Sequence, residues 1–267
     1  MIRLIGIDVD GTLVGESGDI PAVVWDAAQR AREAGIHLAL CSGRAAFGLA
    51  LEFARRLDAD GWHVFQNGAS IVHLGGSRSL SAALPKRVVD VVIEQARSTQ
   101  RVLELYSDTE YVIESTSAWA REHADLLGVP FAARPFEALA GAVVRAQWLV
   151  SGADVQWVKQ HAPPDTEVAD ATSPLMPETH FVGLTLSGVN KGAAIRTIAE
   201  DYGLSLDEVM YVGDARNDLS ALRIVGMPVA MANANPDVIA VAKHVAGDVE
   251  RAGIVDAFEL ALRLNRS

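Results

Sequence analysis

The chain has 267 residues, of which 50% are hydrophobic and 21% charged, so it can bury one large core or two of ordinary size. Its formal net charge of −11 argues against nucleic acid or an anionic membrane as the main partner, although a bound metal could still bring a phosphorylated small molecule to an acidic protein. The only cysteine, Cys41, excludes an intramolecular disulfide, and no stretch approaches the roughly 20 apolar residues of a membrane span. We therefore expect a globular cytoplasmic protein, and the sequence carries no signal for an oligomeric state.

The first third of the chain alternates apolar segments with amphipathic ones. Pro21 opens a pattern of small apolar residues on one helical face and Gly35 closes it, which is the usual order of a proline at a helix start and a glycine after its end. Short apolar strands separated by helices are typical of a parallel sheet covered on both faces. The predicted strands are 4–7, 36–40 and 63–65, and the predicted helices are 21–34 and 45–57.

The last third resumes the same alternation. Asn190 is a suitable N-cap for a helix that Gly203 would end, and Asn235 followed by Pro236 forms a second helix start. The predicted strands here are 209–212, 228–231 and 244–246, and the predicted helices are 191–202, 217–224, a short one from 236, and 254–264.

The middle of the chain has a different pattern. Segments 102–106 and 111–114, separated by a polar turn, predict a hairpin, and 147–150 and 181–186 predict further strands. Segment 162–179 carries four prolines, so we expect it to be rich in loops, with a weak strand at 167–171. We therefore predict an α/β protein. Its core is Rossmann-like, with three layers and a mainly parallel sheet, and is formed by residues 1–81 and 188–267, while an α+β cap is inserted at 82–187.

Two acids follow the first predicted strand. Asp8 and Asp10 are two residues apart, so on an extended strand their side chains point the same way. Two converging carboxylates repel each other unless a cation or a proton is shared between them. This arrangement predicts a divalent metal and phosphate chemistry rather than a purely structural strand end.

Three further motifs are placed to meet this acidic pair. Ser42-Gly43-Arg44 follows the second predicted strand, Gly213-Asp214 follows the strand 209–212, and Lys191 opens a helix. The loops at the carboxyl ends of parallel strands share one crevice, so we expect these side chains to converge.

Each motif supplies something that phosphoryl transfer requires. A carboxylate can act as a nucleophile that forms an acyl phosphate, and a second carboxyl can protonate the leaving oxygen and later accept a proton from water. Mg²⁺ binds oxygen ligands, often one or two carboxylates, while a lysine and a hydroxyl can hold the phosphoryl oxygens on which charge develops.

The order of these motifs resembles that of the haloacid dehalogenase-like phosphatases, and in particular their Cof-type sugar-phosphatase branch. The resemblance covers nearly the whole core and the position of the cap, whereas the cap sequence itself matches no family pattern. The motifs that carry it are Asp8-Val9-Asp10-Gly11-Thr12, Ser42-Gly43-Arg44, Gln66-Asn67-Gly68-Ala69, Asn190-Lys191-Gly192, Gly213-Asp214-Ala215-Arg216-Asn217-Asp218 and Met231-Ala232-Asn233-Ala234.

The resemblance implies a role for each matching residue. It implies that Asp8 is the nucleophile and Asp10 the general acid and base, and that Ser42 and Lys191 bind the phosphoryl group. It also implies Mg²⁺ as the cofactor. The other residues implied at the phosphate or the substrate are Gly11, Thr12, Gly43, Arg44, Asn67 and Asn217, and the implied metal set is Asp8, Asp10 through its carbonyl, Asp214 and Asp218.

The sequence thus predicts a Mg²⁺-dependent phosphatase that hydrolyses a small phosphomonoester, with sugar phosphates first among the substrates that the resemblance implies. One alternative is a phosphotransferase or mutase that passes the phosphoryl group from Asp8 to a hydroxyl. Another is a phosphate-binding or receiver-like module without catalysis. The presence of Asp10 argues against this alternative, because such a module needs no general acid and base.

Overall fold

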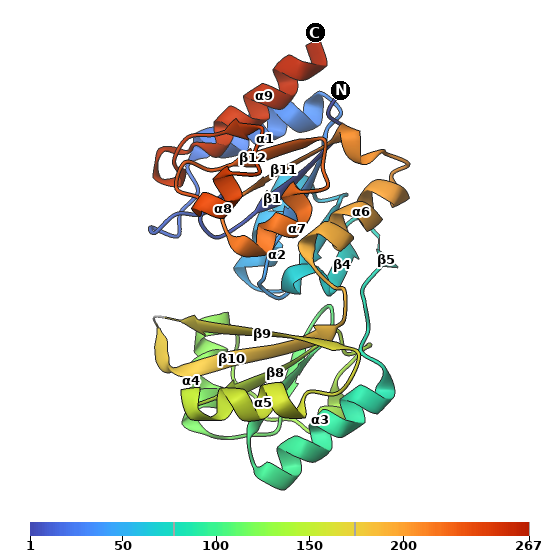
Figure 1. The fold of residues 1–267 in the computed structure, drawn as a ribbon, viewed down its shortest axis with the longest axis vertical. Coiled ribbons are helices and arrows are strands. Elements are labelled where there is room, and N and C mark those ends of the chain that lie inside the picture. The colour runs from blue at the N-terminus through green and yellow to red at the C-terminus, as the bar shows by residue number, and fades with distance from the viewer. Residues whose placement is uncertain (77, 174, 267) are drawn as a thin grey trace. The chain divides into compact units, whose positions relative to one another are not determined.

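The computed structural model describes residues 1–76, 78–173 and 175–266 (Figure 1). The chain divides into two compact units. The first, which we call the core unit, comprises Met1–Arg44, Ala50–Leu80 and Asn190–Ser267. The second, which we call the cap unit, comprises Ala45–Leu49 and Ser81–Val189.

The core unit is built on a sheet with the strand order β13-β12-β11-β1-β2-β3-β4-β5. The strands from β13 to β3 pair in parallel, and β4 and β5 extend the sheet by antiparallel pairing. The central strands are mostly apolar and buried because both faces of the sheet are covered by helices. The strands are β1 Leu4–Asp8, β2 His37–Cys41, β3 Trp62–Phe65, β4 Ser70–His73, β5 Arg78–Ser79, β11 Val209–Gly213, β12 Met227–Ala230 and β13 His244–Val245.

Helices cover both faces of the core sheet. Helix α1 packs against α9, and Trp25 of α1 lies against Phe53 of α2, so these three helices share one face. Helices α6 and α7 pack together on the other face. The helices are α1 Ala22–Glu33, α2 Leu49–Asp58, α6 Lys191–Asp201, α7 Leu219–Leu222, α8 Pro236–Ile239 and α9 Ile254–Arg266, with single 3-10 turns at Gln66–Gly68, Leu206–Glu208, Arg216–Asp218 and Val249–Arg251.

The cap unit is an antiparallel sheet with the strand order β7-β6-β8-β10-β9. Helices α3 and α5 pack on one face of this sheet and α4 packs on the other. The elements are α3 Lys86–Thr99, β6 Val102–Tyr106, β7 Tyr111–Ile113, α4 Ala118–Leu127, β8 Arg145–Val150, α5 Val155–His161, β9 Thr166–Ser173 and β10 Met176–Leu186, with 3-10 turns at Phe136–Ala138 and Gly152–Asp154.

The segment Ala45–Leu49 belongs to the cap unit although its neighbours in sequence belong to the core unit. Its Phe47 ring stacks on Tyr106 and Tyr111, with ring centroids 6.3 and 6.1 Å apart. Gly48 has a φ of +60°, a left-handed conformation that favours glycine and interrupts a helix. The helix predicted over 45–57 therefore begins only at Leu49.

The structure confirms the predicted fold class and the six strands predicted for the outer thirds. It adds β4 and β5, which were not predicted, and it corrects three segments. The helix at 45–57 is the first of these. The second is 162–179, where β9 confirms the weak strand predicted at 167–171 but is longer, and the start of β10 replaces part of the expected loop. The third is the helix predicted at 217–224, where Arg216–Asp218 is a 3-10 turn and only Leu219–Leu222 is α-helical.

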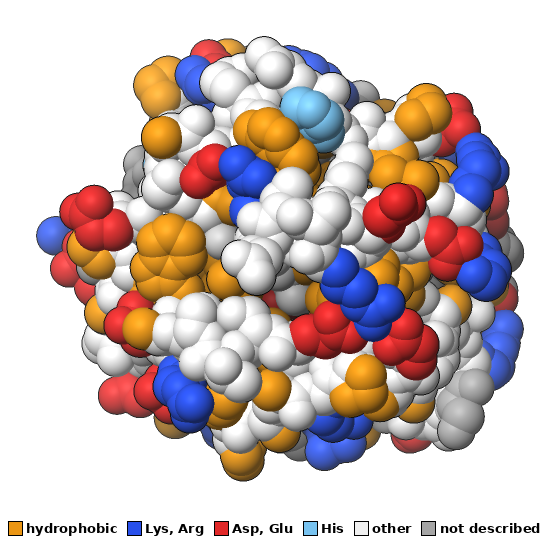
Figure 2. Space-filling view, turned by 90° about the horizontal axis from the view of Figure 1, so that it is seen from below, with side chains coloured by type: hydrophobic (Ala, Val, Ile, Leu, Met, Phe, Trp, Pro, Cys, Tyr) orange, Lys and Arg blue, Asp and Glu red, His pale blue; other side chains and the backbone are white. Residues whose placement is uncertain are grey.

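The surface carries side chains of both charge signs. On the face shown in Figure 2, acidic and basic side chains lie next to one another among scattered hydrophobic ones, and neither sign gathers into one large patch. Among the helices of the described ranges, we find none with the length and apolar character needed to cross a membrane.

Candidate active site

The predicted site residues of the core unit meet at the carboxyl ends of neighbouring strands. Asp8 is the last residue of β1, Ser42 follows β2, and Asp214 follows β11. Lys191 is the first residue of α6, whose start is fixed by the Asn190 side chain accepting the Ala193 N–H at 2.9 Å. The parallel sheet thus brings together groups that lie far apart in the sequence, as the crevice argument predicts.

Lys191 is the buried centre of the site. Its ammonium group donates to Asp8 Oδ1 and, at 2.7 Å, to Asp218 Oδ1. The side chains of Lys191 and Asp218 are fully buried and that of Asp8 nearly so. Burial alone would lower the pKa of Lys191, but the two carboxylates outweigh it and raise that pKa, so the lysine stays charged.

The carboxylates outnumber the lysine. Oxygens of Asp8, Asp214 and Asp218 all lie within 4.8 Å of one another. Burial raises the pKa of Asp8 well above its usual value, and the charges of Asp218 and Asp214 add to this against the opposing effect of Lys191. Burial and Asp218 likewise raise the pKa of Asp214. The cluster therefore holds more carboxylates than one ammonium can balance when all of them are ionised.

The donor set fits Mg²⁺, which prefers oxygen ligands and is commonly held by one or two carboxylates. Asp8 and Asp214 offer such oxygens, and Thr12 Oγ1 donates to Asp214 Oδ1 at 3.2 Å. Gly11 lies so close that a Cβ at this position would overlap the carboxylate of Asp214. Only a glycine therefore leaves room for this arrangement of the two loops, and its φ of +87° also favours glycine.

Asp218 is engaged at both of its oxygens. Oδ1 accepts from Lys191 and from the hydroxyl of Tyr211 at 2.8 Å, and Oδ2 accepts the backbone N–H groups of Asp214 at 3.2 Å and Ala215 at 3.0 Å. Four donors use the lone pairs of one carboxylate. This residue thus holds the lysine and the Asp214 loop in place, and its oxygens also lie within the group of carboxylates that could hold a metal.

The carboxylate of Asp10 stands outside the Asp8, Asp214 and Asp218 group. It pairs with Arg44 through two contacts, Nε to Oδ2 at 3.1 Å and Nη2 to Oδ1 at 2.5 Å. Its side chain is 60% exposed, so it can reach solvent and a bound molecule. Two-point pairing fixes the orientation of both groups.

Hydrogen bonds and close contacts join Ser42 to Arg44, Gly43 to Asn67, and Asn67 to Asn217. Ser42 Oγ accepts the Arg44 N–H at 3.0 Å, which leaves its own hydroxyl proton free to donate. Asn217 Nδ2 donates to Asn67 Oδ1 at 3.0 Å, and a Cβ on Gly43 would lie 3.2 Å from the Asn67 amide. All the predicted site residues therefore lie in or around one cluster of the core unit.

Comparison with known proteins agrees with this geometry. The family described as haloacid dehalogenase-like hydrolase matches residues 5–258. The chain belongs to this family. The resemblance drawn from the motifs is thereby confirmed.

Relatives of this haloacid dehalogenase-like hydrolase include named phosphatases. A 5-amino-6-(5-phospho-D-ribitylamino)uracil phosphatase of Bacillus subtilis is 26% identical over 260 residues, covering 87% of this chain and 88% of its own. An HMP-PP phosphatase of Citrobacter koseri is 25% identical over 258 residues, covering 92% and 89%.

Solved structures share the fold over nearly the whole length. A haloacid dehalogenase-like hydrolase from Bacteroides thetaiotaomicron superposes with a TM-score of 0.82 at 25% identity, covering 97% of this chain and 99% of its own. A sugar phosphatase of haloacid dehalogenase subclass IIB superposes with a TM-score of 0.75 at 24% identity, covering 96% and 98%. The second match, at this identity, speaks for the fold alone.

Two residues of this hydrolase escaped the sequence argument. Tyr211 lies on an apolar strand, where a tyrosine reads as core, and only its hydroxyl contact reveals its place beside Asp218. Asn233 had no role assigned, yet its Nδ2 donates to the Gly11 carbonyl at 2.7 Å and its Oδ1 accepts the Val249 N–H at 3.1 Å. The motif Met231-Ala232-Asn233-Ala234 is the sequence signal that points to Asn233, whereas no sequence pattern points to Tyr211.

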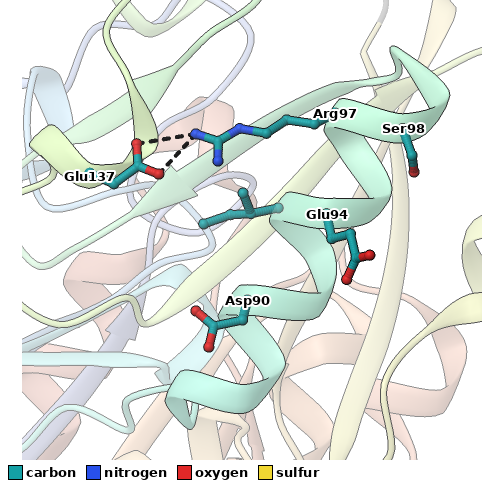
Figure 3. A pocket seen from close by; sticks show the side chains of 6 residues that line it. Asp90, Glu94, Arg97, Ser98 and Glu137 are labelled. Atoms are coloured by element: carbon teal, nitrogen blue, oxygen red, sulfur yellow. Dashed lines mark hydrogen bonds and ion pairs between the residues drawn. The ribbon is translucent and has the colours of Figure 1, made fainter.

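A hollow of about 560 Å³ lies elsewhere, on the cap unit beside α3. Figure 3 shows Asp90, Glu94, Arg97 and Ser98 along this helix, with Arg97 joined to Glu137 by an ion pair of 2.9 Å. The residues that line it include none of the predicted site residues. The buried cluster of the core unit, and not this hollow, is therefore the candidate active site.

Proposed function

We propose that this hydrolase is a Mg²⁺-dependent phosphatase that acts on a small phosphomonoester through an aspartyl phosphate on Asp8. The observation that carries the proposal is the buried cluster in which Lys191 is shared between Asp8 and Asp218 while Asp214 adds a further carboxylate. A purely structural ion pair would balance its charges, because unpaired buried charge is costly. An excess of buried carboxylate supports a site that a cation completes.

The roles follow from the contacts. In the first step a carboxylate oxygen of Asp8 attacks phosphorus, the bond from phosphorus to the ester oxygen breaks, and Asp10 gives that oxygen a proton. In the second step water attacks the same phosphorus, its proton passes to Asp10, and inorganic phosphate leaves with Asp8 restored. The exposure of Asp10 and its pairing with Arg44 support this role, because they orient a carboxyl group that solvent can reach.

Lys191 and Ser42 are proposed to bind the phosphoryl oxygens on which negative charge develops. Bound Mg²⁺, held by Asp8, Asp214 and the Asp10 carbonyl, would neutralise phosphate charge and keep Asp8 in its ionised form. Asp218, Asn217, Asn67, Thr12 and the glycines 11 and 43 are proposed to hold the shape of the phosphate site.

We propose a small phosphorylated metabolite as the substrate, with sugar phosphates first. The names of the relatives support this class, since they include phosphatases of a phosphorylated ribitylamino compound and of HMP-PP. The cap unit, which carries none of these catalytic groups, is proposed to select the substrate.

The test is a screen of phosphate release over a panel of phosphomonoesters with Mg²⁺. Asp8→Asn is the blank, and Asp26→Asn, an exposed aspartate of α1, is the matched control. We expect kcat of Asp8→Asn to fall by a factor on the order of 10⁴ or more, with the fold retained. Metal-dependent phosphate release by Asp8→Asn at the level of Asp26→Asn would contradict the nucleophile. Release that requires an added hydroxyl acceptor would instead identify a phosphotransferase.

A further inference from the structure

Tyr211 lies beneath the catalytic cluster with its hydroxyl directed at Asp218. The residue is on β11, is fully buried, and its Oη donates to Asp218 Oδ1 at 2.8 Å, the same oxygen that accepts from Lys191. We propose that Tyr211 is a positioning residue, which sets how Lys191 is divided between Asp218 and Asp8. This inference rests on the proposed function.

Two glycines in the neighbouring strands leave room for the Tyr211 ring and for the carboxylate that it contacts. Tyr211 pairs in register with Gly6 of β1, and a Cβ on Gly6 would lie 2.6 Å from the tyrosine ring. A Cβ on Gly213 would lie 2.5 Å from the carboxyl carbon of Asp218. Two strand glycines therefore admit the ring and its carboxylate partner, in positions where a strand normally gains from a larger side chain.

The ring and the hydroxyl have separable effects. A phenylalanine would fill the same space beside Gly6, so the packing of β1 against β11 would be kept. The hydroxyl does something else, because it shares Oδ1 of Asp218 with the ammonium group of Lys191. Each donor on one oxygen reduces the negative charge that the other donor meets.

Loss of the hydroxyl therefore has a directional consequence. Asp218 would keep the N–H groups of Asp214 and Ala215 at Oδ2, but Oδ1 would have Lys191 as its donor without the hydroxyl. The ammonium would then bind Asp218 more strongly and Asp8 less strongly. The proposed nucleophile and the phosphoryl oxygens would lose part of the positive charge that faces them.

The kinetic test compares Tyr211→Phe with Tyr202→Phe. Tyr202 is a matched control in the core unit, since its hydroxyl also makes a hydrogen bond by accepting the Trp62 N–H at 3.2 Å. Its partner Trp62 is not one of the predicted site residues. We expect kcat of Tyr211→Phe to fall about tenfold, as for a lost hydrogen bond to a charged group, while KM stays within about twofold. Melting temperatures of the two variants should be similar. Equal kcat values in the two variants, with an active parent, would overturn the proposal, because a purely structural role would move the melting temperature and leave kcat per folded molecule unchanged.

A crystal structure of Tyr211→Phe tests the proposal without reference to turnover. We expect Lys191 Nζ to remain on Asp218 and to leave Asp8. A lysine that still contacts both carboxylates, as it does here, would overturn the positioning role even if the parent hydrolyses phosphomonoesters. Conversely, a displaced lysine in a protein that releases no phosphate would support the positioning role and count against the proposed function alone.

Discussion

The two units bury carboxylates in different ways. In the cap unit, Glu104 is fully buried, and its oxygens meet Tyr106 Oη at 2.7 Å, Gln147 Nε2 at 3.0 Å and His123 Nδ1 at 2.7 Å. In the core unit, Asp8, Asp214 and Asp218 share the single ammonium of Lys191. One buried carboxylate is thus satisfied by its own neighbours, whereas the three carboxylates of the other group have one ammonium between them.

The contrast between Glu104 and the Asp8, Asp214 and Asp218 group separates a structural polar network from a functional one. Burial and short hydrogen bonds occur in both units, so neither property alone identifies a site. The number of carboxylates that share one partner does, because a closed network stabilises the fold by itself while an open one gains from a ligand of opposite charge. This contrast can be tested at four points.

The largest effect is expected from Lys191→Met. Removing the ammonium leaves buried carboxylates without their partner, so the metal-free protein should lose about 3 to 5 kcal/mol of unfolding free energy. The kcat should fall on the order of 10²- to 10³-fold, because a group that faces developing charge is lost. Phosphate release and urea unfolding in EDTA measure the two. Lys243→Met, at an exposed lysine, is the control. Equal losses in both variants would show that the Lys191 ammonium has no special role among the buried carboxylates.

Mg²⁺ should stabilise the core cluster. At a concentration about 100 times its Kd, binding to the folded state adds about 2.7 kcal/mol. Thermal unfolding with and without Mg²⁺ measures this as a rise in melting temperature. Asp214→Asn should lose most of the rise, whereas Glu104→Gln in the cap unit should keep it. A melting temperature of the parent that ignores Mg²⁺ would show that the cluster is not a cation site.

Glu104→Ala should destabilise the protein by about 2 kcal/mol. The change leaves buried donors of Tyr106 and Gln147 without their acceptor. Glu104→Gln should cost less, because it keeps an acceptor oxygen and the side-chain volume. Urea unfolding of both variants gives the values, and the loss should be the same with and without Mg²⁺. A loss that Mg²⁺ restores would mean that the cap network also takes a cation.

The fourth effect concerns pH and is gradual, because it is spread over several pH units. Because the pKa of Asp8 is raised in the folded protein, the folded state keeps a proton that the unfolded state releases above the ordinary carboxyl value near 4. Stability of the metal-free parent should therefore fall as pH rises through that window, with a contribution of at most about 1.4 kcal/mol per pH unit.

Asp8→Asn lacks this proton, so in EDTA its stability relative to the parent should increase from pH 4 towards pH 7. Urea unfolding of both proteins at several pH values measures the difference. A difference that is constant with pH would show that Asp8 titrates normally and that the core cluster is balanced after all.

The sequence predicts most of the core because strand ends, caps and glycines are local signals. Asp8 and Asp214 each follow a predicted strand and Lys191 opens a predicted helix. The parallel sheet then brings these residues to the same edge. The contacts between them are not local. The pairing of Asn67 with Asn217 and of Asp10 with Arg44 depends on side-chain directions that periodicity does not describe.

The cap unit was harder to predict for a physical reason. Strand β9 is mostly exposed and polar, and it lies at the edge of its sheet, so it lacks the apolar alternation that identifies a strand. Prolines at both sides of it favoured a loop. Its partner β10 supplies the hydrogen bonds that make it a strand, and such pairing is not visible in a local window.

The grouping of Ala45–Leu49 with the cap unit bears on how such proteins could be recombined. A chimera that exchanged only Ser81–Val189 for the equivalent part of a relative would separate Phe47 from Tyr106 and Tyr111, leaving an aromatic ring from one parent against unmatched residues of the other. The exchangeable module has two pieces, and the shorter one begins at the residue directly after Arg44.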